Sequence, residues 1–216
     1  MIIAIDGPAA SGKSVTAKKV ADKLDFLHLN TGLMYRAVTL HFINSGVNIN
    51  NKTDILSGLK KMSILFDSMD SNKILLNGQD VSKIIRNKLI DSKVSEVSAI
   101  RSVREKLVVQ QREIAKNNDI VIEGRDIGSY VFPNADFKFF LTADINVRAK
   151  RRYEQKKIKD VSLNNVLFDL KQRDKYDKNR KYSPLVISDD AIIIDTSDLN
   201  IEEQVNKIVK IINKER

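Results

Sequence analysis

Hydrophobic residues along the chain fall into short apolar runs that alternate with segments of helical periodicity. The runs have the length of buried strands and lie at residues 2–5, 26–30, 120–122, 137–141 and 191–195. Amphipathic spacing predicts helices at residues 15–24, 38–43, 53–62, 92–116, 147–153, 162–178 and 201–212. Because strands alternate with helices, the pattern predicts an α/β fold with a parallel five-stranded sheet flanked by helices.

One part of the chain departs from this alternation. Residues 63–67 and 73–76 are short apolar runs, and Asn77-Gly78 follows the second run. This spacing predicts a small antiparallel hairpin, inserted at about residues 63–83. With 216 residues and no repeat or low-complexity tract, we expect a single domain with one small inserted subdomain.

A phosphate-binding motif lies between the first apolar run and the first helix. Gly7-Pro8-Ala9-Ala10-Ser11-Gly12-Lys13-Ser14 fits G-x-x-x-x-G-K-[ST] at every position, and Val15 opens the helix face. In this setting the loop N–H groups and the helix N-terminus form a cradle for anions. Lys13 can reach the β- and γ-phosphates, and Ser14 can ligate magnesium. The motif predicts binding of a nucleoside triphosphate.

The composition narrows the class of protein. Hydrophobic residues at 42% and charged residues at 30% are typical of globular proteins. The net charge of +9 suits a polyanionic ligand, either a nucleotide or RNA, although much of the excess is lysine and equally suits a solvated surface. The absence of cysteine and the presence of only two histidines exclude disulfides, thiolate catalysis and metal clusters built on either residue.

Neither a membrane span nor a secretory signal is visible. No apolar run approaches the length of a spanning helix, and the chain enters its first strand directly, without a charged segment or a cleavage site. We therefore expect a cytoplasmic protein.

The tetrapeptide Asn51-Lys52-Thr53-Asp54 matches the N-K-x-D pattern by which many GTPases hold guanine. Here it follows a polar segment early in the chain, and the D-x-x-G element that senses a γ-phosphate is missing from the sequence. We interpret it as a turn and helix cap, with Thr53 as the N-cap.

Several arginines lie beside predicted strand ends or on polar helix segments. Phosphoryl transfer needs cations that neutralise the moving group and hold donor and acceptor in line, and arginine grips phosphate oxygens bidentately. A phosphate acceptor is already anionic, so no strong base is needed, which fits the shortage of histidine. Each arginine alone is also compatible with a surface position. The five arginines are Arg36, Arg104, Arg125, Arg173 and Arg180.

Polar segments follow the first three predicted strands directly, at residues 7–14, 31–36 and 123–126. Ligands of parallel sheets bind at the carboxyl ends of the strands. We expect these three segments to face one another across one cleft.

The chain resembles the bacterial cytidylate kinases from Ile3 almost to its carboxyl terminus. The segments that carry the resemblance are residues 30–36, 121–128, 131–133, 173–180, 183–185 and 190–198. The insertion at 63–83 is similar to a small-sheet region in the monophosphate-binding part of that family. The resemblance implies the P-loop nucleoside monophosphate kinase fold, with a core of residues 1–30, 92–147 and 179–216, an NMP-binding region of residues 31–91 and a lid of residues 148–178.

The resemblance also implies an activity: transfer of the ATP γ-phosphate to CMP or dCMP, with Mg²⁺ as cofactor. It implies that Arg36, Arg125 and Arg180 hold the acceptor and transferring phosphates. It assigns Ser95, Arg104 and Asp126 to the cytosine ring, and Arg173 and Asp177 to the sugar. The implied catalytic residues are Lys13, Arg125, Asp126 and Arg180, and the implied lid cations over ATP are Arg148 and Arg152.

Physical logic supports the choice of base. Cytosine offers an N4 amino donor beside N3 and O2 acceptors, which a carboxylate and an arginine complement. Uracil reverses donor and acceptor at these edges and leaves buried groups unpaired. Glu123 stands where some relatives have aspartate, and its role, either organising the water shell of magnesium or orienting Arg125, stays open.

Two other functions stay open. One is a P-loop kinase of another small acceptor, such as UMP or shikimate. The other is a basic RNA-binding protein with a nucleotide-dependent switch, which would need aromatic stacking platforms; aromatic residues are only 6% of the chain and do not cluster with the basic runs. We expect small-molecule substrates, no nucleic-acid or membrane partner, and a monomer.

Overall fold

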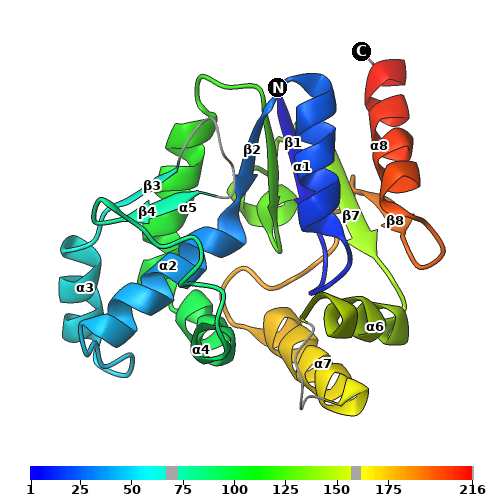
Figure 1. The fold of residues 1–216 in the computed structure, drawn as a ribbon. Helices are drawn as coiled ribbons and strands as arrows, with labels where there is room; N and C mark the ends of the chain where they lie inside the picture. Colours follow the sequence, from blue (N-terminus) through cyan, green and yellow to red (C-terminus); the bar gives the residue numbers. More distant parts are fainter. Residues whose placement is uncertain (67–72, 157–161, 216) are drawn as a thin grey trace. The chain divides into compact units, whose positions relative to one another are not determined.

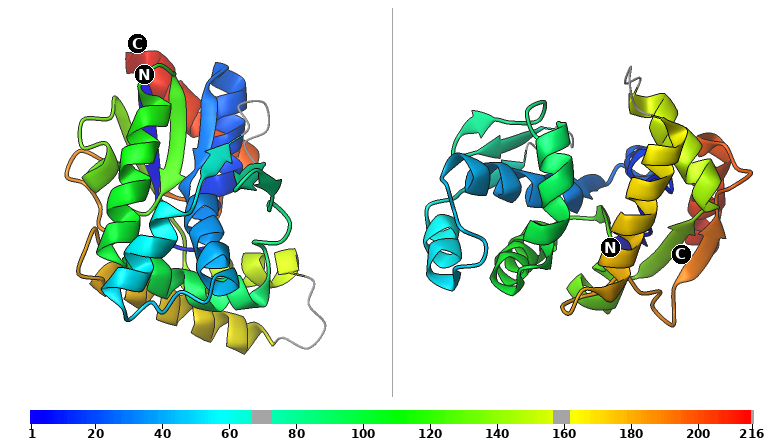
Figure 2. Two further views of the ribbon diagram at one scale, coloured as in Figure 1. Left: turned by 90° about the vertical axis from the view of Figure 1, so that its left-hand side faces the viewer. Right: turned by 90° about the horizontal axis from the view of Figure 1, so that it is seen from below.

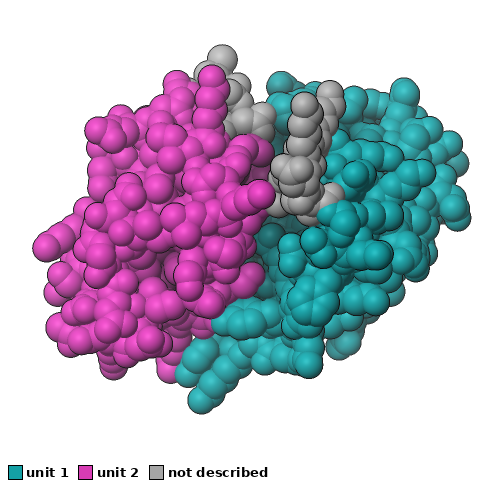
Figure 3. Space-filling model, turned by 60° about the horizontal axis from the view of Figure 1, so that its bottom comes forward, with its two compact units in different colours: residues 1–28, 119–216 teal, residues 29–118 magenta. Residues whose placement is uncertain are grey.

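The computed structural model describes residues 1–66, 73–156 and 162–215. The chain forms two compact units (Figure 3), unit 1 of residues 1–28 with 119–216 and unit 2 of residues 29–118. The predicted lid and the predicted inserted hairpin fall partly on residues 157–161 and 67–72, which lie outside the described residues.

The larger sheet has five strands in the order β2-β6-β1-β7-β8, and all of it lies in unit 1 except the last two residues of β2. The central strand β1 pairs in parallel with β6 and with β7, and β7 pairs in parallel with β8. The α/β class and the five-stranded sheet predicted from the apolar runs are confirmed. The strands are β1 (Ile2–Asp6), β2 (Leu27–Asn30), β6 (Ile120–Gly124), β7 (Phe137–Thr142) and β8 (Ile192–Asp195).

Two helices, α1 (Lys13–Leu24) and α8 (Ile201–Glu215), pack side by side on the sheet (Figure 1). Ile3 and Ile5, alternate residues of β1, form one fully buried core cluster with residues of both helices. The helices α6 and α7 pack against each other (Figure 2), and a short π-helical turn, η1, follows β6. Their bounds are α6 (Ile145–Lys156), α7 (Leu163–Asn179) and η1 (Ile127–Val131).

Unit 2 has a hydrophobic core of its own, which includes the fully buried side chains of Met34, Ile74, Ile85 and Leu107. Its small sheet has the order β3-β4-β5, and both pairings are antiparallel. The predicted hairpin is confirmed, with a third short strand added. The elements are α2 (Thr31–Asn44), α3 (Lys52–Lys60), β3 (Ile64–Phe66), β4 (Ile74–Leu76), β5 (Gln79–Asp80), α4 (Lys88–Ala99) and α5 (Arg101–Ala115).

The single helix expected over residues 92–116 is wrong, because α4 and α5 are separate helices. Ile100 between them has an extended backbone, with φ −69° and ψ 122°. A guanidinium nitrogen of Arg104 donates to the carbonyl of Ser98 at 3.1 Å, and this carbonyl is among those that a helix end leaves without a helical partner. A side-chain contact therefore accompanies the break, and apolar periodicity does not report such contacts.

The interpretation of residues 51–54 as a turn and helix cap is confirmed, but the capping residue is Asn51 rather than Thr53. The Oδ1 atom of Asn51 accepts the N–H groups of Thr53 and Asp54 at 2.9 and 3.3 Å. Asparagine is among the best N-cap residues because its short side chain reaches the free N–H groups of the first turn.

Candidate active site

The segment between β1 and α1 adopts a conformation that requires glycine at both motif positions. Gly7 has a φ of 153°, and a Cβ atom there would lie 2.1 Å from the carbonyl oxygen of Leu141 in β7. Gly12 has a φ of 92° and occupies the N-cap position of α1. The helix begins directly after it, at Lys13, so its first N–H groups and the positive end of its dipole adjoin the loop. This is the anion cradle that the motif predicts.

Lys13 lies over the loop in a buried position. Its Nζ atom donates to the carbonyl of Pro8 at 3.1 Å. Burial, and next the charge of Arg125, lower the pKa of Lys13 to about 7, while Glu123 and Asp177 oppose the shift. A lysine with a lowered pKa gains from a nearby anion, because a phosphate would restore the preference for the ammonium form. The electrostatics of the loop thus fit a phosphate ligand.

Ser14 and Glu123 form an oxygen pair beside Lys13. The Ser14 hydroxyl donates to Oε2 of Glu123 at 2.7 Å, and this carboxylate is 2% exposed at the end of β6. The His28 Nε2 atom lies 3.8 Å from Oε1 of Glu123, and burial lowers the pKa of His28 to about 4. Hydroxyl and carboxylate oxygens fit Mg²⁺, which keeps several waters and takes phosphate oxygens, so it needs few protein ligands.

A chain of alternating charges follows β6 and reaches α7. The Nε atom of Arg125 donates to Oδ2 of Asp177 at 2.9 Å. A guanidinium nitrogen of Arg180 lies 4.0 Å from Oδ1 of Asp177, and another donates to Oδ1 of Asp126 at 3.3 Å. Burial raises the pKa of Asp177, but the neighbouring arginines outweigh it and hold this pKa below its usual value. The carboxylate of Asp177 is therefore held in its charged form.

Arg173 belongs to the same cluster. Its charge lowers the pKa of both Lys13 and Asp177, so its guanidinium lies near the phosphate loop and the arginine–carboxylate chain. Unit 1 thus brings together six of the residues that the sequence predicted for the site. They come from α1, from the segment after β6, from α7 and from the residue that follows α7. They are Lys13, Arg125, Asp126, Arg173, Asp177 and Arg180.

Arg148 lies beside the phosphate loop, where it is buried rather than exposed. Its guanidinium donates to the carbonyls of Ala143 and Ala9 at 3.0 and 3.1 Å and to Oδ2 of Asp174 at 2.6 Å. This side chain connects the loop, the end of β7 and α7. Arg152, the second predicted lid cation, is half-buried on the same helix. Contact of either arginine with ATP stays a prediction.

In unit 2, Arg36 is held between two partners. Its guanidinium donates to the carbonyl of Ile85 at 3.0 Å and to Oδ1 of Asp91 at 2.5 Å. Asp91 is one helical turn before Ser95 on α4, so both residues share a face of this helix. Ser95 is half-buried.

Arg104 lies nearby in the same unit and is only 2% exposed. Its guanidinium carbon is 5.4 Å from the ring centre of Tyr35, a cation–π contact that orients the planar group. The sequence did not single out Tyr35 or Asp91. For Tyr35, the position directly before Arg36 could have indicated a place in the site. For Asp91, the sequence offered no indication other than its spacing from Ser95.

Three comparisons with known proteins agree. Residues 3–214 match the family model described as cytidylate kinase. The chain belongs to the cytidylate kinase family. It is 47% identical over 214 residues to a cytidylate kinase of Caldanaerobacter subterraneus subsp. tengcongensis, over 98% of this chain and 94% of that protein. It is 45% identical to a cytidylate kinase of Clostridium botulinum strain Okra, over 99% and 98%.

Solved structures show a likeness of fold. A shikimate kinase from Bacteroides thetaiotaomicron aligns with a TM-score of 0.51 and 11% identity, over 99% of this chain and 98% of that one. The predicted P-loop kinase fold and the resemblance to the cytidylate kinases are confirmed. The assignment of individual residues to base, sugar and phosphates, and the joint cleft of residues 7–14, 31–36 and 123–126, stay predictions.

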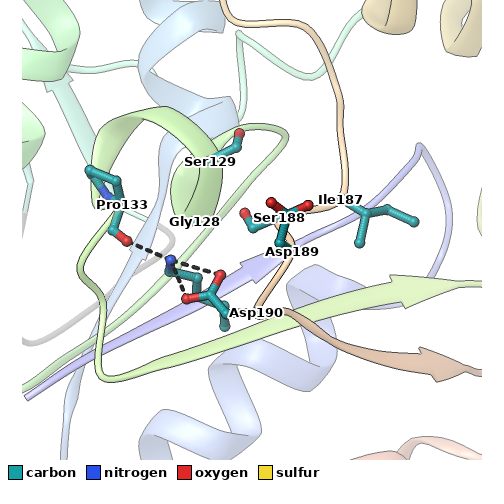
Figure 4. Close-up of a pocket in the computed structure, with 8 residues that line it drawn as sticks. Gly128, Ser129, Pro133, Ile187, Ser188, Asp189 and Asp190 are labelled. Carbon is teal, nitrogen blue, oxygen red and sulfur yellow. Dashed lines mark hydrogen bonds and ion pairs between the residues drawn. The ribbon is translucent and has the colours of Figure 1, made fainter.

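A separate pocket of about 440 Å³ lies beside η1 (Figure 4). Lys138 of β7 donates to both carboxylate oxygens of Asp190 at 2.9 and 2.6 Å and to the carbonyl of Pro133. Its ammonium is thus already neutralised, and the described residues that line the pocket include none of the predicted site residues. The lining is Gly128, Ser129, Pro133, Lys138, Ile187, Ser188, Asp189 and Asp190.

Over the described ranges, none of the helices is long and apolar enough to cross a membrane. Nor does any group of three or more His, Cys, Asp or Glu side chains there form a candidate metal cluster.

Proposed function

We propose that this cytidylate kinase family member transfers the γ-phosphate of ATP to CMP or dCMP, giving CDP or dCDP. The observation that carries the proposal is the arginine cluster around Asp177, which lies near Lys13 of the phosphate loop. The loop fits the phosphates of a nucleotide donor, and the cluster fits an acceptor that is itself a phosphate.

The chemistry follows from charge placement. The acceptor oxygen is anionic near neutral pH and attacks the γ-phosphorus without a general base. The bond between the γ-phosphorus and the oxygen that bridges it to the β-phosphate breaks, and ADP leaves. Lys13 and Arg125 supply positive charge where negative charge develops on the transferring group, and Arg180 holds the acceptor phosphate in line with it. Because Asp177 and Asp126 already fix the arginines, little reorganisation is required when the substrates bind.

ATP is the phosphate donor of this reaction, and we propose Mg²⁺ as its cofactor. Ser14 would hold the ion, and Glu123 would hold it through a water molecule, since their oxygens already lie 2.7 Å apart. When bound, the ion supplies charge neutralisation at the donor phosphates.

CMP offers the protein a base, a sugar and a phosphate to recognise. We assign Ser95, Arg104 and Asp126 to the cytosine ring, Arg173 and Asp177 to the sugar, and Arg36 to the acceptor phosphate. The buried, oriented guanidinium of Arg104 supports a role in reading a base. We further propose a cytoplasmic monomer with small-molecule substrates and no nucleic-acid or membrane partner.

A coupled assay with ATP and Mg²⁺ tests the function, with CMP, dCMP, UMP and shikimate as separate acceptors. We expect kcat/KM for CMP or dCMP to exceed that for UMP by about a hundredfold or more, because uracil leaves buried groups unpaired. A Lys13→Ala sample from the same preparation controls for contaminating kinases. Use of UMP or shikimate as well as or better than CMP refutes the assignment of CMP or dCMP as acceptor. Retention of RNA by the protein on filters at physiological salt refutes the proposal that it has no nucleic-acid partner.

A further inference from the structure

Asp6 is a buried carboxylate that the proposed reaction does not use. It is the last residue of β1, directly before Gly7 of the phosphate loop, and is 5% exposed. Its two oxygens accept backbone N–H groups from η1, Oδ1 from Ile127 at 2.9 Å and Oδ2 from Gly128 at 2.8 Å. These residues come directly after Arg125 and Asp126, so one side chain links the start of the phosphate loop to the end of the arginine–carboxylate chain.

The first N–H groups of a helical turn are usually satisfied by the side chain at its own N-cap position. In η1 this position belongs to Asp126, yet the Asp126 side chain makes no capping hydrogen bond. Its carboxylate instead accepts from Arg180, while its carbonyl accepts the N–H groups of Tyr130 and Val131. Asp6 thus does the capping that Asp126 would otherwise do.

We propose that Asp6 is a positioning residue of the acceptor site: by capping η1 from the neighbouring strand, it leaves the Asp126 carboxylate available to hold Arg180. This inference rests on the proposed CMP kinase activity.

The energetics of Asp6 agree with a functional rather than a purely stabilising role. Burial raises the pKa of Asp6 to about 7. The N–H groups of Gly128 and Ile127 oppose the shift, the charge of Asp126 adds to it, and that of Arg125 opposes it. The ionised carboxylate is therefore costly to bury at neutral pH, even with both N–H groups bound.

Asp136 offers a matched control in the same unit. Its Oδ2 atom accepts the N–H of Ile2 at 2.6 Å, at the opposite end of β1. Asp6→Asn and Asp136→Asn each replace a carboxylate that accepts backbone N–H groups, those of η1 for Asp6 and that of Ile2 in β1 for Asp136. In Asp6→Asn the new amide group faces one of the two N–H groups as a second donor.

The experiment is a double-mutant cycle on kcat/KM for CMP, with Asp6→Asn, Asp126→Asn and the combined variant. We expect Asp6→Asn to lower kcat/KM by about tenfold or more, since misplacement of a holding group costs rate. In the Asp126→Asn background the same change should cost less than about threefold, because its effect passes through Asp126. Asp136→Asn should stay within about twofold of the wild-type protein. Equal losses in both backgrounds overturn the proposal.

A second measurement needs neither activity nor a variant. Amide hydrogen exchange of the wild-type protein should show Ile127 and Gly128 protected, because both N–H groups are bound within the core. Rapid exchange at both amides overturns the proposal even if Asp6→Asn does not fold. If the wild-type protein fails to phosphorylate CMP while these amides are protected, the proposed function fails and the capping contact stands.

Discussion

Removal of Arg148 alone from its buried ion pair with Asp174 should destabilise the protein strongly. Both side chains are largely buried, with 8% and 13% of their side-chain surface exposed, and a guanidinium nitrogen lies 2.6 Å from the carboxylate. Arg148→Met leaves the Asp174 charge without this partner inside the protein. Breaking a buried pair in this way costs about 3–5 kcal/mol. For a chain of this length each kcal/mol lowers the melting temperature by roughly 2–4 °C.

The residues around the pair determine how much stability a variant with both partners replaced should lose. Ala9, Ala149, Val166 and Leu170 form an apolar cluster where the phosphate loop meets α6 and α7, so Arg148→Met with Asp174→Leu replaces the pair by apolar side chains. Such replacements are often neutral. The carbonyls that Arg148 also binds would each lose a donor, at about 1 kcal/mol apiece. We therefore expect the double variant to recover roughly half of the loss.

Urea unfolding followed by circular dichroism measures both effects, with Lys150→Met as the control on the exposed face of the same helix. The control should change stability by less than about 0.5 kcal/mol. A loss of under about 1 kcal/mol in Arg148→Met, or a double variant no better than the single one, refutes the reasoning. In the double variant, KM for ATP within about threefold of wild type fits a purely structural Arg148, whereas a tenfold rise favours direct contact with ATP.

Three further predictions concern the phosphate loop and the sheet. Lys13→Ala should lower kcat roughly a thousandfold without loss of stability, because burial already disfavours the Lys13 charge; near-normal turnover of folded protein contradicts this. Gly7→Ala should cost about 2 kcal/mol or more and abolish ATP binding, measured by calorimetry, because its Cβ would meet the carbonyl of Leu141. Burial keeps the pKa of His28 at about 4, so the unfolded chain binds more protons between pH 6.5 and 4. Acidification over this range should therefore cost up to about 3 kcal/mol of unfolding free energy relative to His28→Gln; parallel pH profiles of the two proteins would exclude this contribution.

Much of the fold could be predicted because its signals are local. The apolar runs marked all five strands of the large sheet, and the loop of residues 7–14 was recognisable from residue types at fixed spacing. The starts and ends of helices could be predicted less well from the sequence. The break at Ile100 is accompanied by a hydrogen bond from Arg104 to the carbonyl of Ser98, and neither a proline nor a glycine marks it.

Partners of the charged residues could not be predicted, because they lie far apart in the chain. Arg125 and Asp177 are 52 positions apart, and Ser14 and Glu123 are 109 apart. The resemblance to the cytidylate kinases indicated which arginines and carboxylates would serve the site, but tertiary packing decides which ones pair. Arg148 illustrates the difference: the resemblance implied a lid cation over ATP, but it gave no sign of the buried ion pair that this side chain forms with Asp174.

The lowered pKa values of Lys13 and Asp177 together describe the electrostatic state of the site. Burial is the largest cause of the lowered pKa of Lys13 and opposes the lowered pKa of Asp177, while Arg125 and Arg173 lower the pKa of both groups. Positive charge therefore exceeds negative charge around these groups, even after Asp177 has neutralised part of it. A protein bears this repulsion at a cost in stability, and an arriving phosphate removes it. We expect substrate phosphates to remove this repulsion on binding, which would favour the more highly charged transition state.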